Sequence, residues 1–230
     1  MNEIHPTALI EGDVTIGADN VIGPHVVITG PVEIGSGNWI GAGVVIGAPP
    51  EVRTWPHPTP GAPSVAGGVV IGDRNVIREY AQIHQGWKAK TVIGDEAFIM
   101  NQCYIAHDCS LGSGVTMASS VLLAGHVQLD DGVNLGLGTT VHQFRTIGRG
   151  SMVGMSSVVT RDLPPYAKAF GSPATVRGAN VIGMERSGVD GGLVARISAL
   201  YDGTETDPSG IADDRIREQI TAWMEGGARA

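Results

Sequence analysis

Large aliphatic residues recur at every sixth position over most of the chain. The register runs from Ile4 to Ile46, from Ile71 to Ile83 and from Ile93 to Val159, which makes twenty-three hexads. A small or β-branched residue, or an asparagine, usually stands two positions earlier, and glycine often follows the aliphatic. A period of six fits neither an α-helix nor a plain strand alternation, whereas it fits short strands separated by turns. Three hexads would close a triangular coil of about 18 residues, so the pattern predicts a mainly β solenoid of about eight coils.

Two segments interrupt this register, at about residues 47–70 and 84–92. The first contains six of the thirteen prolines, and the second carries Trp87, Lys88 and Lys90. Long loops in a compact domain are usually functional or disordered. We predict a functional role, because both loops contain tryptophan and cations.

The repeat stops after Val159. Residues 161–178 are predicted to form an extended cap, and residues 191–201 and 210–226 have the apolar spacing of two amphipathic helices, the second with Ser209 as N-cap. These helices are expected to cover the strand edges of the last coil. The predicted organisation is a solenoid domain over residues 1–178, with the two loop insertions, and a C-terminal helical segment over residues 179–230.

Composition narrows the class of protein. Glycine makes up 34 of 230 residues and aromatic residues only 5%, so the core must consist of small and β-branched aliphatics. The net charge of −8 argues against a nucleic-acid binder. Cys103 and Cys109 are too few for a disulfide scaffold and favour a reducing compartment. With neither a signal peptide nor a membrane-spanning run in the sequence, we predict a cytoplasmic protein.

Three of the seven histidines, His107, His126 and His142, are spaced by nearly one coil. The spacing is 19 for the first pair and 16 for the second, close to three hexads, so we expect the three side chains near one edge on successive coils. A single histidine in such a chain is usually a surface or turn residue. Three imidazoles along one edge favour a site instead, and in a trimer that edge could line a cleft between subunits.

Several stretches resemble those of a known family. They are IHPTA (4–8), IGDRNVIRE (71–79), IAHDC (105–109), LAGHV (123–127), VHQF (141–144), LPPY (163–166) and NVIGMERSG (180–188). The chain resembles the hexapeptide-repeat acyltransferases, which fold as left-handed parallel β-helices and work as trimers. More narrowly, it resembles the acyl-carrier-protein–UDP-N-acetylglucosamine O-acyltransferases of lipid A synthesis. The resemblance implies a homotrimer that moves an acyl chain from acyl carrier protein to a hydroxyl of UDP-N-acetylglucosamine or a related nucleotide sugar, with no metal and no cofactor beyond the acyl donor.

The resemblance also implies catalytic roles. His107 corresponds to the general base that removes the hydroxyl proton, a task suited to an imidazole. Asp108 corresponds to its orienting partner, which requires a turn there, because adjacent strand residues point to opposite faces. The backbone N–H of Gly125 corresponds to the donor for the oxyanion.

Further residues are implied to bind substrate. Those for the nucleotide sugar are His126, His142, Gln143, Asn180, Arg186, Glu51, Arg53 and His84. Met155 corresponds to the floor of the acyl pocket and predicts a medium-length acyl chain. The sequence departs from the family where Ser187 replaces a second arginine and where Tyr104 replaces a histidine. An acidic carrier protein also requires a local basic patch, for which the candidates are Arg145, Arg149, Arg161, Lys168 and Arg177.

Other functions stay open at this point. The nearest is an N- or O-acyltransferase that uses CoA, or acyl carrier protein, on a different nucleotide sugar. A β-helical γ-class carbonic anhydrase would need a close histidine pair on one strand and turn, and the three histidines each lie on separate coils. A third alternative is a non-catalytic β-helix.

Overall fold

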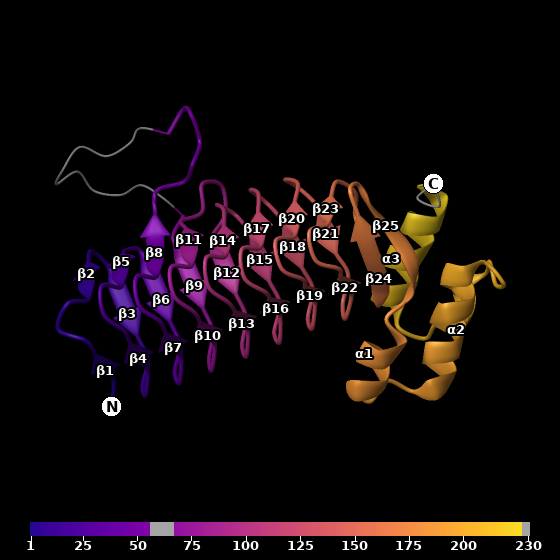
Figure 1. The fold of residues 1–230 in the computed structure, drawn as a ribbon, viewed down its shortest axis with the longest axis horizontal. Helices are drawn as coiled ribbons and strands as arrows, with labels where there is room; N and C mark the ends of the chain where they lie inside the picture. The colour runs from indigo at the N-terminus through magenta and orange to yellow at the C-terminus, as the bar shows by residue number, and fades with distance from the viewer. Residues whose placement is uncertain (56–66, 227–230) are drawn as a thin grey trace.

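The computed structural model describes residues 1–55 and 67–226. The chain winds into a three-sided parallel β-helix that ends in a hairpin and a group of helices (Figure 1). The first side is a sheet of ten strands: β1 (Glu3–Ile4), β4 (Val21–Ile22), β7 (Trp39–Ile40), β10 (Val76–Ile77), β13 (Phe98–Ile99), β16 (Thr116–Met117), β19 (Asn134–Leu135), β22 (Met152–Val153), β24 (Ala167–Gly171) and β25 (Ala174–Ala179). The second side has eight: β2 (Leu9–Glu11), β5 (Val27–Thr29), β8 (Val45–Ala48), β11 (Gln82–His84), β14 (Tyr104–Ile105), β17 (Leu122–Leu123), β20 (Thr140–Val141) and β23 (Val158–Val159). The third has seven: β3 (Val14–Ile16), β6 (Val32–Ile34), β9 (Val69–Ile71), β12 (Thr91–Ile93), β15 (Ser110–Leu111), β18 (Gln128–Leu129) and β21 (Thr146–Ile147).

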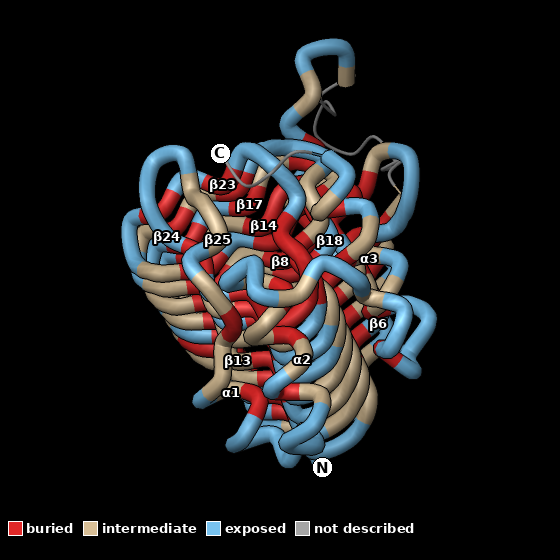
Figure 2. Tube along the Cα trace, turned by 90° about the vertical axis from the view of Figure 1, so that its right-hand side faces the viewer, coloured by how far each residue is buried: buried red, intermediate tan, exposed pale blue. Residues whose placement is uncertain are grey.

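The six-residue repeat sets the register of each sheet. In the ten-stranded sheet Ile4 pairs with Ile22, and Ile22 pairs with Ile40, so identical positions stack one coil apart. From Ile22 onward these aliphatics are almost completely buried, as at Ile40 and Ile105, whereas Ile4 in the first coil is exposed. Figure 2 looks along the coil and shows buried segments on its strands and exposed segments around its rim. Stacked aliphatics fill the interior, so the fold needs few aromatic residues.

The two predicted insertions lie where a coil is longer than three hexads. Ile16 pairs with Ile34 across an uninterrupted coil, whereas Ile34 pairs with Ile71 across the first insertion, which makes that coil roughly twice as long. Strands β8 and β9 extend into its predicted limits, and residues 56–66 lie outside the described part of the chain. The second insertion is bounded by β11 and β12, so His84 and Thr91 belong to strands and the connection is residues 85–90.

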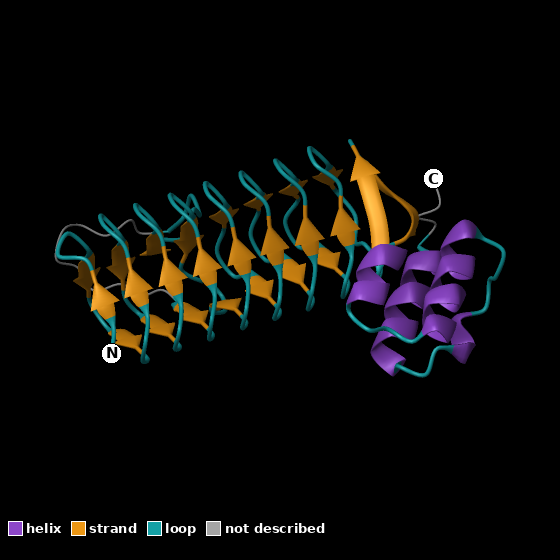
Figure 3. Cartoon of the chain, turned by 60° about the horizontal axis from the view of Figure 1, so that its bottom comes forward, coloured by secondary structure: helices purple, strands orange, loops and turns teal. Residues whose placement is uncertain are grey.

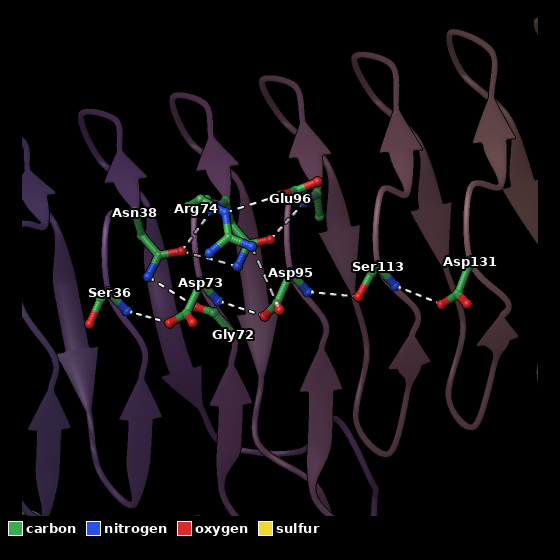
Figure 4. Close-up of polar contacts among 11 residues, drawn as sticks. Ser36, Asn38, Gly72, Asp73, Arg74, Asp95, Glu96, Ser113 and Asp131 are labelled. Atoms are coloured by element: carbon green, nitrogen blue, oxygen red, sulfur yellow. Dashed lines mark hydrogen bonds and ion pairs between the residues drawn. The ribbon is translucent and has the colours of Figure 1, made fainter. Parts of the chain in front are cut away.

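Polar ladders run along the coil beside the aliphatic columns. Asn20, Asn38 and Asn75 interrupt the small-residue position, and each of the last two donates its side-chain amide to the carbonyl of the asparagine one coil before it, at 2.9 and 3.0 Å. A second ladder lies in the turns (Figure 4), where backbone N–H groups donate to side chains on the next coil, as from Asp73 to Asp95 at 2.8 Å and from Ser113 to Asp131 at 2.9 Å. The asparagine ladder satisfies buried polar groups that a solenoid of aliphatics would otherwise leave unpaired, and the turn ladder pairs backbone N–H groups nearer the surface.

The C-terminal segment closes the last coil. Strands β24 and β25 form an antiparallel hairpin at the edge of the ten-stranded sheet, which confirms the extended cap. Beyond it lie α1 (Val181–Arg186), α2 (Gly191–Asp202) and α3 (Asp214–Glu225), grouped at one end of the solenoid (Figure 3). They share a second apolar cluster that includes Tyr166, Met184, Ile197, Leu200 and Ile220.

The prediction of Ser209 as an N-cap was wrong. Ser209 lies in a short 3-10 turn, and Asp213 caps α3 by accepting a hydrogen bond from the N–H of Ile216 at 3.0 Å. Helix α3 therefore begins at Asp214, later than predicted, because a carboxylate at position 213 competes better for the helix N-terminus. In the described part of the chain, no helix has the length and apolarity needed to cross a bilayer.

Candidate active site

His107 and Asp108 occupy the turn between β14 and β15, where the eight-stranded sheet meets the seven-stranded one. Asp108 has a left-handed backbone with φ of 62°, a conformation that aspartate tolerates better than most residues. This kink directs two adjacent side chains toward one another, and the Nδ1 of His107 lies 2.7 Å from the Oδ2 of Asp108. The turn that the His–Asp pair requires is therefore present, and a carboxylate partner makes Nδ1 the donor nitrogen and leaves the Nε2 lone pair available to accept a proton.

The carboxylate of Asp108 is also bound by the backbone of the second loop. Its Oδ1 accepts hydrogen bonds from the N–H groups of Trp87, Lys88 and Ala89, at 3.0, 2.7 and 2.6 Å. Only 1% of the side chain is exposed. Burial by itself would raise the pKa of Asp108, but the N–H of Ala89, the imidazole of His107 and the other two N–H groups outweigh it and lower that pKa below its ordinary 3.8. Asp108 is therefore a permanent anion at neutral pH.

Replacing Asp108 with asparagine should remove an acid-sensitive part of the stability. Because the folded pKa of Asp108 is depressed, its contribution to the free energy of unfolding is fully present above about pH 4 and is lost as pH falls through the folded value. We expect Asp108→Asn to be less stable by about 2 kcal/mol at pH 7, the scale of hydrogen bonds to a charged acceptor. Urea unfolding of both proteins at several pH values measures this difference. A difference that grows below pH 4 would contradict the assignment.

One coil further on, Gly125 and His126 occupy the equivalent turn. The rings of His107 and His126 meet edge to face with centroids 5.1 Å apart, and His126 Nε2 lies 3.6 Å from the Oδ2 of Asp108. The backbone of Gly125 lies directly against the imidazole, since a Cβ there would be 2.6 Å from Cε1 and 2.8 Å from Nε2 of His107. The N–H of Gly125 donates to no described residue. Gly125 is therefore a residue against the His107 ring whose N–H is unused within the described part of the chain.

The structure brings two of the three predicted imidazoles together, and Phe144 lies where the third was expected. Asp108, His126 and Phe144 occupy equivalent turn positions on this edge, one coil apart, and each has a positive φ. The ring of Phe144 stacks on that of His126, with ring centroids 4.4 Å apart. His142 lies two positions earlier, is exposed, and contacts the carbonyl of neighbouring Gln143 through Nδ1 at 3.2 Å. All three histidines thus lie at the expected edge, in turns between the eight-stranded and seven-stranded sheets, but the ring contact joins only His107 and His126, because the spacing from His126 to His142 is shorter than a full coil.

A second group lies on β8, β11 and β14 and the residues that follow β8. The Nδ1 of His84 bonds to the carbonyl of Pro49 at 2.8 Å, and its ring lies 5.0 Å from that of Tyr104. The hydroxyl of Tyr104 donates to Glu51. Burial, and then this bond to a carboxylate, raise the pKa of Tyr104 above its usual range. Two predicted residues, His84 and Glu51, thus contact Tyr104 on the strand that leads to His107, and exposed Arg53 follows Glu51 by two residues.

Three other predicted residues lie away from His107 within one chain. Asn180 caps α1 and donates to the carbonyl of Gly150 at 2.9 Å, and Arg186 is exposed at the end of that helix. Met155 is 69% exposed in the turn after β22, where the ten-stranded sheet meets the eight-stranded one. That turn is on a different edge of the prism from the turn of His107.

His107, Asp108 and His126 also make a group with metal-ligand chemistry. One ligand atom from each lies within 4.8 Å of the others. Hydrogen bonds already use the Nδ1 of His107 and both oxygens of Asp108, with Oδ1 shared by three N–H groups. The arrangement fits acid–base chemistry, in which one nitrogen is held and the other is left to act.

Sequence and structure comparisons identify the family of this chain. Residues 90–125 match the profile of the bacterial transferase hexapeptide (six repeats), and residues 162–211 match domain 2 of UDP N-acetylglucosamine O-acyltransferase. A protein of Vibrio atlanticus named acyl-[acyl-carrier-protein]–UDP-N-acetylglucosamine O-acyltransferase is 45% identical over 213 residues, which cover 86% of this chain and 81% of that protein. The chain belongs to the UDP-N-acetylglucosamine O-acyltransferase family.

Solved structures of this family extend the likeness over nearly the whole chain. The UDP-N-acetylglucosamine acyltransferase from Campylobacter jejuni superposes with a TM-score of 0.77 at 31% identity and covers 97% of this chain and 96% of its own. These matches confirm the predicted left-handed parallel β-helix and the resemblance in the sequence motifs. A relative from Paracidovorax citrulli is 46% identical over 134 residues, so that the matched part of the chain spans about half, 51%, of that relative's length.

Proposed function

We propose that this protein transfers an acyl chain from acyl carrier protein to a hydroxyl of UDP-N-acetylglucosamine, as a step of lipid A synthesis. The observation that carries the proposal is the His107 imidazole, held through Nδ1 by buried Asp108 and lying against the backbone of Gly125. The names of the relatives in Vibrio atlanticus and Campylobacter jejuni supply the substrates. The reaction needs a base, an orienting anion and an oxyanion donor, so no further cofactor is part of the proposal.

In the proposed reaction each of these residues has one step. The Nε2 of His107 takes the proton of the sugar hydroxyl while its oxygen attacks the thioester carbonyl. Asp108 stabilises the imidazolium that forms, and the N–H of Gly125 donates to the oxyanion of the tetrahedral intermediate. The carbon–sulfur bond then breaks, and the imidazolium returns its proton to the departing thiolate. The products are the acyl ester and the free thiol of the carrier.

A homotrimer is part of the proposal. Within one chain Asn180 and Arg186 lie at the two ends of α1, and Met155 lies on another edge of the solenoid than His107, so a neighbouring subunit would supply them across a cleft. Exposed apolar side chains on the eight-stranded side and its edge, such as Leu122 and Phe144, suit such an interface.

The remaining predicted residues are assigned to the substrates. His126, His142, Gln143, His84, Glu51 and Arg53 would contact the nucleotide sugar, and Met155 would limit the acyl chain to medium length. For the carrier protein we retain the basic patch of Arg145, Arg149, Arg161, Lys168 and Arg177. Two of its members already have carboxylate partners, because Arg145 lies 3.3 Å from Asp162 and Arg149 lies 2.7 Å from Asp131. We place the enzyme in the cytoplasm, where its buried cysteines stay reduced.

A substrate panel tests the proposal. Purified protein is incubated with several nucleotide sugars and with acyl chains of graded length, each on acyl carrier protein and on CoA, and products are read by mass spectrometry. We expect an O-acylated UDP-N-acetylglucosamine from a medium-length carrier thioester. A product only from CoA, or only from another nucleotide sugar, would replace the proposal with the alternative that Ser187 and Tyr104 leave open. No product from any pair would favour a non-catalytic solenoid.

A further inference from the structure

The second loop places an aromatic ring and a cation beside the base. Residues 85–90 connect β11 to β12, and the indole ring of Trp87 meets the His107 ring edge to face, with centroids 6.2 Å apart. The ammonium of Lys88 lies over that indole, with Nζ 4.0 Å from the ring centroid. Trp87 is half-buried, and Lys88 is exposed. The exposed ammonium of Lys88 therefore lies against the Trp87 ring, and the Trp87 ring in turn contacts the ring of His107.

This loop is held firmly in place. Asp108 binds the N–H groups of residues 87–89, so the carboxylate that orients His107 also fixes the position of Trp87. At the base of the loop, Gly86 donates to the carbonyl of Gly68 at 3.1 Å and accepts from the N–H of Gly67 at 2.8 Å. A side chain at Gly86 would collide with the carbonyl of Ala89, so the tight turn requires glycine. The ring and the cation are thus preorganised around the site.

The charge on Lys88 lacks an anionic partner in the described part of the chain. Asp108 is not available to it, because both of its oxygens are taken by nearby donors and its side chain is buried. Lys90, on the same loop, has a carboxylate partner in Glu33, at 2.6 Å. A cation–π contact uses the face of the ring and leaves ammonium N–H groups free to bind oxygen. Lys88 is therefore a preorganised cation beside the base with donors available for an anion.

We propose that Trp87 and Lys88 form a phosphate-binding wall of the active site. The ammonium of Lys88 binds a phosphate of a substrate, and the ring of Trp87 holds that ammonium in position. The proposal rests on the proposed function, because both substrates of that reaction carry phosphate. One source is the diphosphate of the nucleotide sugar, and the other is the phosphopantetheine arm of the carrier protein. A lysine ammonium recognises either as a point charge. Trp87 also covers one side of His107, which excludes water from the base.

The two lysines of the loop provide a matched pair of variants. Lys88→Gln removes the unpartnered cation, and Lys90→Gln removes the one paired with Glu33. We expect Lys88→Gln to raise the KM for one substrate about 10-fold, the scale of one hydrogen bond to a charged group, with kcat within about 2-fold of wild type. Lys90→Gln should leave both KM values within about 2-fold. If the KM for UDP-N-acetylglucosamine rises, Lys88 binds the diphosphate of the nucleotide sugar. If the KM for acyl carrier protein rises, Lys88 binds the phosphate of the phosphopantetheine arm.

Equilibrium binding separates this inference from the reaction itself. Calorimetric titration of UDP and of unacylated holo-carrier protein into wild type and both variants needs no turnover. We expect Lys88→Gln, but not Lys90→Gln, to raise the Kd of one ligand about 10-fold, with a smaller difference at high salt. If Lys88→Gln matches wild type for both ligands, or wild type binds neither, the phosphate-binding wall is wrong. Binding as expected without any turnover would leave the wall in place and reject the proposed function.

Discussion

Replacing His107 with alanine is expected to lower kcat by about 100-fold or more while the fold stays intact. In the proposed mechanism the imidazole of His107 is the base, which the buried carboxylate of Asp108 holds in position, and general-base catalysis contributes about 10²- to 10⁴-fold. The measurement is initial velocity with UDP-N-acetylglucosamine and an acyl carrier thioester, for wild type and variant. Circular dichroism and thermal unfolding of both proteins report on the fold.

A surface histidine controls for this change. His5 is exposed and lies in the first coil, with a contact to Thr7 only two residues away. His5→Ala should keep kcat within about 2-fold. If the His107→Ala variant folds normally and retains more than a tenth of the wild-type kcat, His107 is not the general base.

Adding one methyl group at Gly125 is expected to reduce kcat/KM by about 100-fold. The new Cβ would lie 2.6 Å from Cε1 of His107, closer than carbon atoms can approach, so the ring must move away from its position. A displacement of about 1 Å at a reacting group costs about 10²-fold. The effect should appear in steady-state kinetics of Gly125→Ala, and the displaced ring should be visible in a structure of the variant.

Gly191 offers the control for that methyl group. Gly191 is the first residue of α2, and a Cβ there would have no neighbouring atom within 4 Å. Gly191→Ala should therefore leave kcat/KM unchanged. If Gly125→Ala has wild-type kcat/KM, the close contact between that turn and His107 has no part in catalysis.

The solenoid could be predicted because each coil packs only on the coils next to it in the sequence. Each aliphatic of the hexad meets the same position one coil away, as Ile22 meets Ile40, so a local repeat in the sequence determines long-range pairing. The His107–Asp108 pair was predicted from the resemblance to a known family, and the turn that it requires is present at Asp108. The C-terminal helices were less predictable at their ends. Several acceptors compete for each helix N-terminus, and Asp213 was preferred over Ser209.

What the sequence did not reveal is what surrounds the base. Phe144 follows His126 by one full coil of three hexads, and that spacing was a usable signal for the ring that stacks on His126. Trp87 had no such signal, because it lies in a loop outside the repeat and is positioned by hydrogen bonds to Asp108. Met155 and His107 lie in turns at different edges of the three-sided solenoid. The repeat shows which edge each turn occupies only when the strands have been assigned to the three sheets.

The most direct test of the account is a crystal structure of the wild-type protein with UDP-N-acetylglucosamine and no acyl donor. We expect a sugar hydroxyl within hydrogen-bond distance of the His107 Nε2, about 2.6–3.2 Å, with Asp108 still bound to Nδ1. The nucleotide sugar bound elsewhere on the solenoid, or bound with every hydroxyl turned away from His107, would contradict it.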